Sequence, residues 1–477
     1  MSDPLRNLNS QQLAAVTLPA EHALILAGAG SGKTRVLITR LAWLIQTGQI
    51  TPHQVLAVTF TNKAAREMLA RAAALLPIDT RGMWVGTFHG LSNRLLRAHH
   101  REAGLPRLFQ ILDASDQLSA IKRLLRNLNI DDEKHPPREL SWFINAQKEA
   151  GLRPHAVQAR DDFTRRRVEI YQEYENQCQR EGVVDFAELL LRTYELLSRN
   201  EPLREHYQAR FRHVLVDEFQ DTNRLQYQWL KLMAGSTAAM FCVGDDDQSI
   251  YAFRGAQVAN MLEFEREFRV ANVVRLEQNY RSHGNILDAA NAIIRHNNAR
   301  LGKNLWTDAG SGELLHVFEA GGDVEEAHWI ADRIRELTGN GLPPGDGERP
   351  VGASSEPTGR ARFRRVRIAL LYRSNAQSRV LEHALFAAGI PYRVYGGLRF
   401  FERQEIRHAL AYLRLIANPD DDTAFVRVVN FPARGIGARS LESLQDRARA
   451  RGTSLHGAAG QLAGKAGAAV GVFLALL

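Results

Sequence analysis

Residues 23–34, Ala-Leu-Ile-Leu-Ala-Gly-Ala-Gly-Ser-Gly-Lys-Thr, decide the fold class of this chain of 477 residues. An apolar run leads into a glycine-rich loop, and the loop opens an apolar-periodic stretch over Thr34–Ile45. Strand, glycine-rich loop and helix in this order are the context that a P-loop requires, here with Ala27 in place of the first glycine. The stretch therefore predicts an α/β domain that binds a nucleotide phosphate.

The loop offers the chemistry that phosphates need. Its glycines let the backbone curl so that N–H groups point at phosphate oxygens, and the helix N-terminus favours negative charge. We expect Lys33 to reach the β- and γ-phosphates of ATP and Thr34 to ligate Mg²⁺. The ATP-binding residues predicted from this stretch are Ala27, Gly28, Ala29, Gly30, Ser31, Gly32, Lys33, Thr34 and Arg35.

An acidic pair follows a second apolar run, Val214–Val216. We expect Asp217 to serve as a second Mg²⁺ ligand beside Thr34, and Glu218 to lie beside the attacking water. Gln248, which follows the next apolar run, is expected to sense the γ-phosphate. Carboxylates at strand ends are commonly just solvated, but together with the P-loop this pair indicates ATP hydrolysis.

Similar apolar runs recur in two clusters, and runs of this kind are typical of buried parallel strands with functional loops at their carboxyl ends. A long stretch of helical periodicity separates the clusters. We predict one α/β motor domain, 1–90 and 213–280, that carries a helical insertion, 91–212. The strands expected in it are 23–27, 55–60, 84–87, 214–216 and 240–243.

A second α/β pattern begins near residue 281 and predicts a partial second motor domain, 281–395. Within it, residues 339–365 are rich in Gly, Pro, Ser and Arg, which predicts an exposed flexible loop. The chain is expected to be helical over 396–477. The elements expected before that are strands over 314–318 and 367–372 and helices over 324–337 and 377–388.

Composition narrows the class of protein. Apolar residues make up 45% and charged residues 24%, and Lys and Arg outnumber Asp and Glu by 61 to 53, which gives +8 and suits a polyanionic partner. Two cysteines cannot form a disulfide framework or a four-thiolate zinc site. With no secretory signal and no apolar run of the ~20 residues that a membrane span needs, we expect a soluble, cytoplasmic protein.

Short motifs along residues 8–447 resemble those of superfamily 1 DNA helicases of the UvrD/Rep/PcrA type. They occur in the family's order, from the P-loop to the segment at 400–405. The quoted matches are VTFTNKAA at 58–65, GTFHG at 86–90, VDEFQDT at 216–222, GDDDQSIY at 244–251, QNYRS at 278–282, YRSNAQSR at 372–379 and FFERQE at 400–405.

The resemblance implies a fold and an ATP site. It implies a RecA-like first motor domain, a partial second RecA-like domain and a partial helical duplex-binding domain. Gln12 matches a residue that reads adenine, Tyr280 one that stacks on adenine, and Arg281 one that reaches the γ-phosphate from the second domain. ATP and Mg²⁺ are the implied cofactors, and the implied catalytic residues are Lys33, Asp217, Glu218, Gln248 and Arg281.

The resemblance also implies a track for single-stranded DNA, in which aromatic rings among polar and basic residues stack on bases regardless of sequence. Phe186 suits core packing equally well. Phe253 stands where the family usually has Trp, so we expect stacking to survive with less area. The residues matching DNA-contacting positions are Phe60, Thr61, His89, Phe186, Tyr251, Phe253, Arg254, Arg373, Asn375, Gly435 and Gly437.

The predicted function is that of an ATP-dependent 3′→5′ DNA helicase and single-strand translocase of DNA repair. Its expected partners are single-stranded DNA, single-strand/duplex junctions and mismatch- or excision-repair proteins, bound as a monomer or a DNA-dependent dimer. Because two further family motifs are not seen after Arg434, we expect a chain truncated before them. The alternatives are a helicase–nuclease subunit of the RecB or AddA type, which needs a nuclease domain, and a catalytically impaired DNA-binding fragment.

Overall fold

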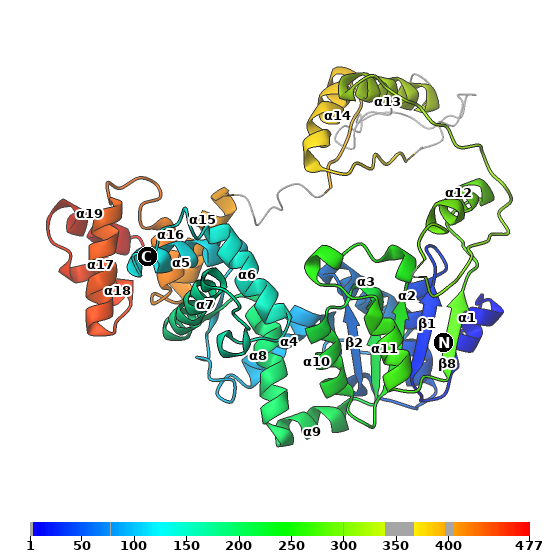
Figure 1. Cartoon of the computed structure of the whole chain (residues 1–477), viewed down its shortest axis with the longest axis horizontal. Helices are drawn as coiled ribbons and strands as arrows, with labels where there is room; N and C mark the ends of the chain where they lie inside the picture. The colour runs from blue at the N-terminus through cyan, green and yellow to red at the C-terminus, as the bar shows by residue number, and fades with distance from the viewer. Residues whose placement is uncertain (1–2, 77, 299, 339–366, 396–403) are drawn as a thin grey trace, which may run out of the picture. The chain divides into compact units, whose positions relative to one another are not determined.

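The computed structural model describes the whole chain except residues 1–2, 77, 299, 339–366 and 396–403. The described residues form two compact units, Met1–Leu315 and His316–Leu477 (Figure 1). The first unit holds the P-loop and both acidic motifs. The two units divide at Leu315, not at residue 281. The expected boundary between two motor domains at residue 281 stays a prediction.

A six-stranded parallel sheet forms the centre of the first unit, in the order β3-β2-β6-β7-β1-β8. β1 pairs with β7 through Ala23 opposite Phe241 and with β8 through Ala23 opposite Asn272. The five expected strands are confirmed to within a residue or two at each end. The strands are β1 Ala23–Ala27, β2 Val55–Thr59, β3 Trp84–Thr87, β6 His213–Val216, β7 Ala239–Gly244 and β8 Asn272–Leu276.

Sequence reasoning missed β8. This strand lies at the edge of the sheet, and most of its residues are half-buried, with Arg275 exposed. It therefore lacks the continuous apolar run that marks the strands buried on both faces.

Each face of the sheet is covered by helices, because successive side chains of a strand point to opposite sides. Leu24 and Leu26 of β1 belong to a core that includes residues of α4, α8, α10 and α11. Ile25, between them, belongs to the core formed with α1, α2 and α3. These helices span α1 Ser10–Val16, α2 Lys33–Gln46, α3 Asn62–Leu75, α4 Phe88–Ala98, α8 Phe186–Arg199, α10 Arg224–Ala234 and α11 Ala259–Glu267; α12 spans Gly284–Ile294.

The predicted helical insertion has its own small core, made by α5, α6 and α7 around Ile121, Ile144 and Tyr174. It also contains a two-stranded parallel pair, Gln110–Ile111 (β4) and Val183–Val184 (β5), that the helical periodicity did not predict. The helices are α5 Ala114–Asn127, α6 Pro137–Glu149, α7 Asp162–Glu181 and α9 Glu201–Arg210.

The second unit is helical over its described residues, so the strands expected at 314–318 and 367–372 are wrong. A strand needs a neighbour to pair its backbone groups, and these segments have none among the described residues. The expected helices are confirmed as α13 and α14. The helices are α13 Asp323–Thr338, α14 Asn375–Ala387, α15 Gln404–Ala417, α16 Asp422–Val428, α17 Ala438–Arg451, α18 Leu455–Ala458 and α19 Gly464–Leu474.

Two predicted segments cannot be compared with the structure. The loop at 339–365 and the start of the motif at 400–405 lie outside the described residues. Over the part of the chain that is described, no helix combines the length and apolar character needed to cross a membrane.

Candidate ATP site and single-strand cavity

The P-loop connects β1 to α2 through a backbone that only small residues suit. Gly30 and Gly32 have φ of 70° and 91°, in the left-handed region that favours glycine. A Cβ on Gly30 would also lie 2.5 Å from Asn279 Nδ2. The loop thus packs against the fourth motif, and α2 begins at Lys33 with its N-terminal amides free to meet an anion.

Lys33 lies among carboxylates of the second and third motifs. Its Nζ is 3.2 Å from Glu218 Oε2 and 3.9 Å from Asp245 Oδ2, and its side chain is only 11% exposed. This ammonium makes no hydrogen bond within the described residues. A buried ammonium that has ion pairs but no hydrogen bond is poorly satisfied, which fits a group placed to meet phosphate oxygens.

The acidic pair follows β6, as predicted. Glu218 has φ 50° and ψ 48°, a left-handed conformation that a residue with a Cβ seldom adopts and that often marks a functional position. Burial, and then the charge of Glu218, raises the pKa of Asp217 to about 6. The same two causes raise the pKa of Asp221 to about 6. A nearby cation would relieve this crowding of negative charge.

The third motif contains three carboxylates that already have cations. Lys303 Nζ lies 2.7 Å from Asp245 Oδ1 and 2.9 Å from Asp247 Oδ2, and it also contacts Asp246. These three aspartates are the one group of carboxylates in the described chain with metal-like spacing. Because a buried lysine lies among them, they are an ion cluster, and Asp217 is the better candidate for Mg²⁺. Gln248 donates from Nε2 to Asp245.

The predicted adenine residues lie beside the P-loop. Gln12 is buried and donates from Nε2 to the Ser31 carbonyl at 2.9 Å. Tyr280 is 56% exposed, and its backbone N–H donates to the Gly30 carbonyl at 3.0 Å. Arg281 is exposed next to it. The structure therefore brings these residues to the P-loop, and their roles toward ATP stay predictions.

A cavity of about 940 Å³ brings together four of the predicted DNA-contacting side chains. Phe60, His89, Phe186 and Phe253 all line it, although they come from four separate segments. Tyr251 packs against two of these rings in tilted arrangements, with its ring centroid 5.0 Å from that of Phe60 and 6.0 Å from that of Phe253. Exposed fractions of 53% for Phe186 and 79% for Phe253 exclude core packing as the reason for these rings.

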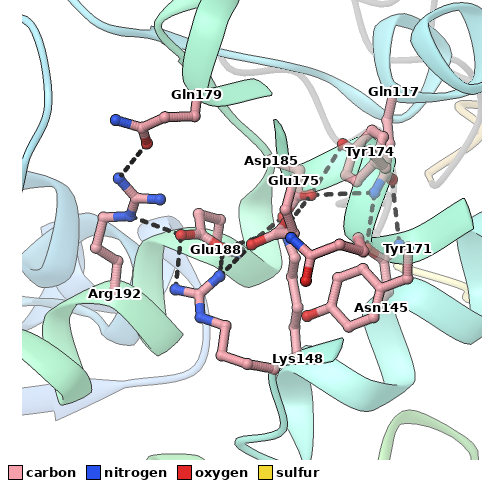
Figure 2. Close-up of polar contacts among 12 residues, drawn as sticks. Gln117, Asn145, Lys148, Tyr171, Tyr174, Glu175, Gln179, Asp185, Glu188 and Arg192 are labelled. Atoms are coloured by element: carbon pink, nitrogen blue, oxygen red, sulfur yellow. Dashed lines mark hydrogen bonds and ion pairs between the residues drawn. The ribbon is translucent and has the colours of Figure 1, made fainter. Parts of the chain in front are cut away.

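A buried ion cluster joins α6 to α8, and residues of both helices form part of the wall of this cavity. Figure 2 shows polar contacts of the cluster. We call Lys148, Arg153, Glu175, Asp185 and Glu188 the Lys148 cluster. Lys148 Nζ, 1% exposed, lies 2.6 Å from Glu175, 2.8 Å from Asp185 and 3.0 Å from Glu188. Burial would lower the pKa of Lys148, but these carboxylates raise it well above its usual value. The cluster ties α6 and α7 to α8, whose first residue lines the cavity.

Replacing the central lysine should therefore destabilise this wall. We expect Lys148→Met to lower the opening free energy of amides in α6 and α8 by about 3–5 kcal/mol, because it leaves buried carboxylates without their cation. Native-state hydrogen exchange measures this change. Lys122→Met, an exposed lysine of α5, is the matched control and should stay within about 0.5 kcal/mol of the parent. Equal protection in both variants would contradict the role of the cluster.

Thr61 does not line the cavity, and the roles of the other predicted DNA residues stay predictions. Thr61 caps α3 by accepting a hydrogen bond from the Ala64 N–H at 3.1 Å. The side chain of Arg254 lies outside the described part of the chain. Four of the predicted DNA residues lie in the second unit and are exposed there: Arg373, Asn375, Gly435 and Gly437.

Sequence reasoning missed two residues of these sites. Lys303 follows no strand and belongs to no quoted motif, so its contact with the third motif needs the fold. Trp142 lines the aromatic cavity from α6 and is 69% exposed. The helical spacing of Trp142, Asn145 and Glu149 could have indicated a shared face, but not what that face meets.

Comparisons with known proteins agree with the motifs. DNA helicase II of Escherichia coli (strain K12) is 51% identical over 480 residues, covering 99% of this chain and 64% of the relative. DNA helicase II of Salmonella typhimurium is 50% identical with the same coverage. ATP-dependent DNA helicase PcrA of Leuconostoc citreum is 42% identical, covering 95% of this chain and 58% of the relative. The chain thus spans less than two thirds of the length of these relatives.

Two family models account for most of the chain. The UvrD/REP helicase N-terminal domain matches residues 8–269, and the UvrD-like helicase C-terminal domain matches residues 274–463. Because the C-terminal domain is represented over those residues, the comparison does not support the expected truncation. With the P-loop, the acidic pair and the aromatic cavity in the places that the motifs predict, the chain belongs to the UvrD/REP family of helicases.

Proposed function

We propose that this protein is an ATP-driven motor that moves along single-stranded DNA and unwinds duplex DNA. The observation that carries the proposal is the segment 217–223, which borders both sites. It begins at the carboxylates beside Lys33 and ends at Asp221 and Asn223, which line the aromatic cavity. A change at the phosphate site therefore has a short path to the cavity.

The ATP half of the proposal uses this chain's own groups. Lys33 would bind the β- and γ-phosphates, and Glu218, 3.2 Å from it, would accept a proton from the attacking water. The donor set fits Mg²⁺, because Asp217 is a buried carboxylate whose raised pKa a cation would lower, and Thr34 supplies a hydroxyl. Bound there, Mg²⁺ would neutralise charge on the phosphates. Arg281 and Gln248 would contact the γ-phosphate.

The DNA half rests on the cavity. Its exposed rings would stack on successive bases, and stacking tolerates any sequence because each base has a π-face. The cavity holds few cations, so the phosphates would be met outside it. Residues of the second unit, Arg373 and Asn375, are proposed to contact the strand as well.

A connection within the first unit supports coupling between the halves. The backbone N–H of Gln257 donates to the Thr222 carbonyl at 3.0 Å, and Asn223 forms a β-bridge with Ala256. The loop that carries Phe253 is thereby fixed to the segment that carries Glu218. Movement of either is transmitted through these backbone bonds.

We further propose 3′→5′ movement, action at single-strand/duplex junctions and a role in DNA repair. An unwinding assay on duplexes with a 3′ or a 5′ single-strand tail tests the direction. Unwinding of the 3′-tailed duplex alone is the expected result. Preference for the 5′ tail would contradict it.

Removing the most exposed ring should weaken DNA binding. We expect Phe253→Ala to lose about 1–3 kcal/mol of single-strand affinity with an unchanged salt slope, because stacking releases no counterions. Phe253→Trp should bind as well or better. Fluorescence anisotropy with a labelled oligonucleotide measures both, and Phe163→Ala, an exposed ring on α7 outside the cavity, is the control. Wild-type affinity in Phe253→Ala would remove the cavity from the proposal.

A further inference from the structure

One face of α6 borders the aromatic cavity. Trp142, Asn145, Ala146 and Glu149 all line the cavity, and their spacing places them on one side of the helix. The Trp142 side chain is 69% exposed, although tryptophan is highly buried in most proteins. Together with the exposed rings of Phe186 and Phe253 in the same cavity, Trp142 forms an apolar surface of the kind that marks a binding site.

The other rings of the cavity come from different elements. Phe60 follows β2, His89 lies in α4, Phe186 begins α8, and Phe253 lies in the loop after β7. Burial lowers the pKa of His89, so this ring is neutral at pH 7 and can act as another flat surface. Trp142 adds an indole, the largest aromatic face in the set, from the helical insertion.

The helix that carries Trp142 is tied to α8 by the Lys148 cluster, whose polar contacts Figure 2 shows. Lys148 is buried in the same helix and pairs with Asp185 at 2.8 Å. Asp185 caps α8 by accepting a hydrogen bond from the Glu188 N–H at 2.8 Å, and the next residue is Phe186.

A second set of contacts, made by Gln117, joins α6 to the start of α8. Gln117 donates to Asn145 Oδ1 at 2.8 Å and to Asp185 Oδ2 at 3.3 Å. The helices that carry Trp142 and Phe186 are therefore held together before any ligand binds. Such preorganisation lowers the cost of ordering side chains on binding.

We propose that Trp142 is a base-stacking residue of the single-strand site, supplied by the helical insertion. The proposal rests on the proposed function, and it commits to a nucleobase as the occupant because the ring shares its cavity with five other flat side chains, the buried Phe88 among them. Stacking on an exposed indole should quench its fluorescence as well as add affinity.

Intrinsic fluorescence tests the proposal directly. The chain has six tryptophans, and Trp142 is the one that lines the cavity. Titrating the 477-residue chain with oligo(dT) should quench its emission. In Trp142→Phe this quench should disappear while binding by anisotropy persists. The matched control, Trp329→Phe, replaces a partly exposed tryptophan of the second unit and should keep the quench.

Affinity provides the second readout. Trp142→Ala should weaken oligo(dT) binding by about 5- to 150-fold with an unchanged salt slope, and its exposed position should leave thermal unfolding unchanged. If Phe253→Ala weakens binding while Trp142→Ala binds as tightly as the parent and Trp142→Phe still quenches, the Trp142 proposal is wrong and the proposed function stands. If neither alanine variant weakens binding, the proposed function itself fails.

Discussion

Lys33→Met should reduce ATP turnover by at least about 10²-fold, the effect expected when a preorganised charge on the transferring phosphate is lost. In the structure this ammonium is buried among Glu218 and Asp245 and makes no hydrogen bond within the described residues. Nothing else described in the P-loop supplies a positive side chain at that place. Steady-state phosphate release at saturating ATP and oligonucleotide measures the loss.

Single-strand binding by the same variant separates a chemical defect from an unfolded chain. Lys33 lies at the start of α2 and is not among the residues that line the aromatic cavity. We therefore expect Lys33→Met to keep most of its affinity for oligo(dT), and Lys122→Met, an exposed lysine of the insertion, to keep both activities. Equal loss of DNA binding in a folded Lys33→Met chain would argue against the P-loop assignment.

Glu218→Gln should bind ATP yet lose hydrolysis by about 10²–10⁴-fold, the usual contribution of a general base. The amide keeps the shape of the side chain but cannot accept a proton from water. The left-handed backbone of Glu218 and its position 3.2 Å from Lys33 indicate that the fold holds this carboxylate in one place. Single-turnover hydrolysis, combined with a nucleotide-binding titration, distinguishes binding from chemistry.

The matched control for this variant is Glu263→Gln, an exposed carboxylate of α11 that should hydrolyse ATP at the parent rate. A Glu218→Gln chain with unchanged turnover would exclude this residue as the base. In that case Asp221, a neighbour of Glu218 whose pKa is also raised to about 6, would be the next carboxylate to examine.

Much of the first unit could be predicted from sequence because its signals are local. A strand buried on both faces needs a continuous apolar run, and the loops after β1, β6 and β7 carry the polar residues of the site. β8 escaped prediction because it is an edge strand that contains the exposed Arg275. The strands expected at 314–318 and 367–372 failed for the opposite reason, since β-rich composition does not supply a partner strand.

The residues of the two sites also divide into those that a local sequence signal could predict and those that it could not. Lys33, Glu218, Phe60 and His89 stand in short motifs that can be recognised from the sequence alone. Lys303 and Trp142 do not, because each depends on which elements the fold places opposite it. The Lys148 cluster is a further case, since its members lie in three helices and in the segments next to them, and their sequence positions look like those of ordinary surface charges.

ATP hydrolysis by the 477-residue chain, measured with and without single-stranded DNA, tests whether the phosphate site and the aromatic cavity work together. We predict a rate that rises with oligo(dT) concentration, disappears in Lys33→Met, and needs more oligonucleotide for half-maximal stimulation in Phe253→Ala. The shared segment 217–223 is the physical reason for that link. A rate that is the same with and without DNA would contradict the claim that the two sites form one motor.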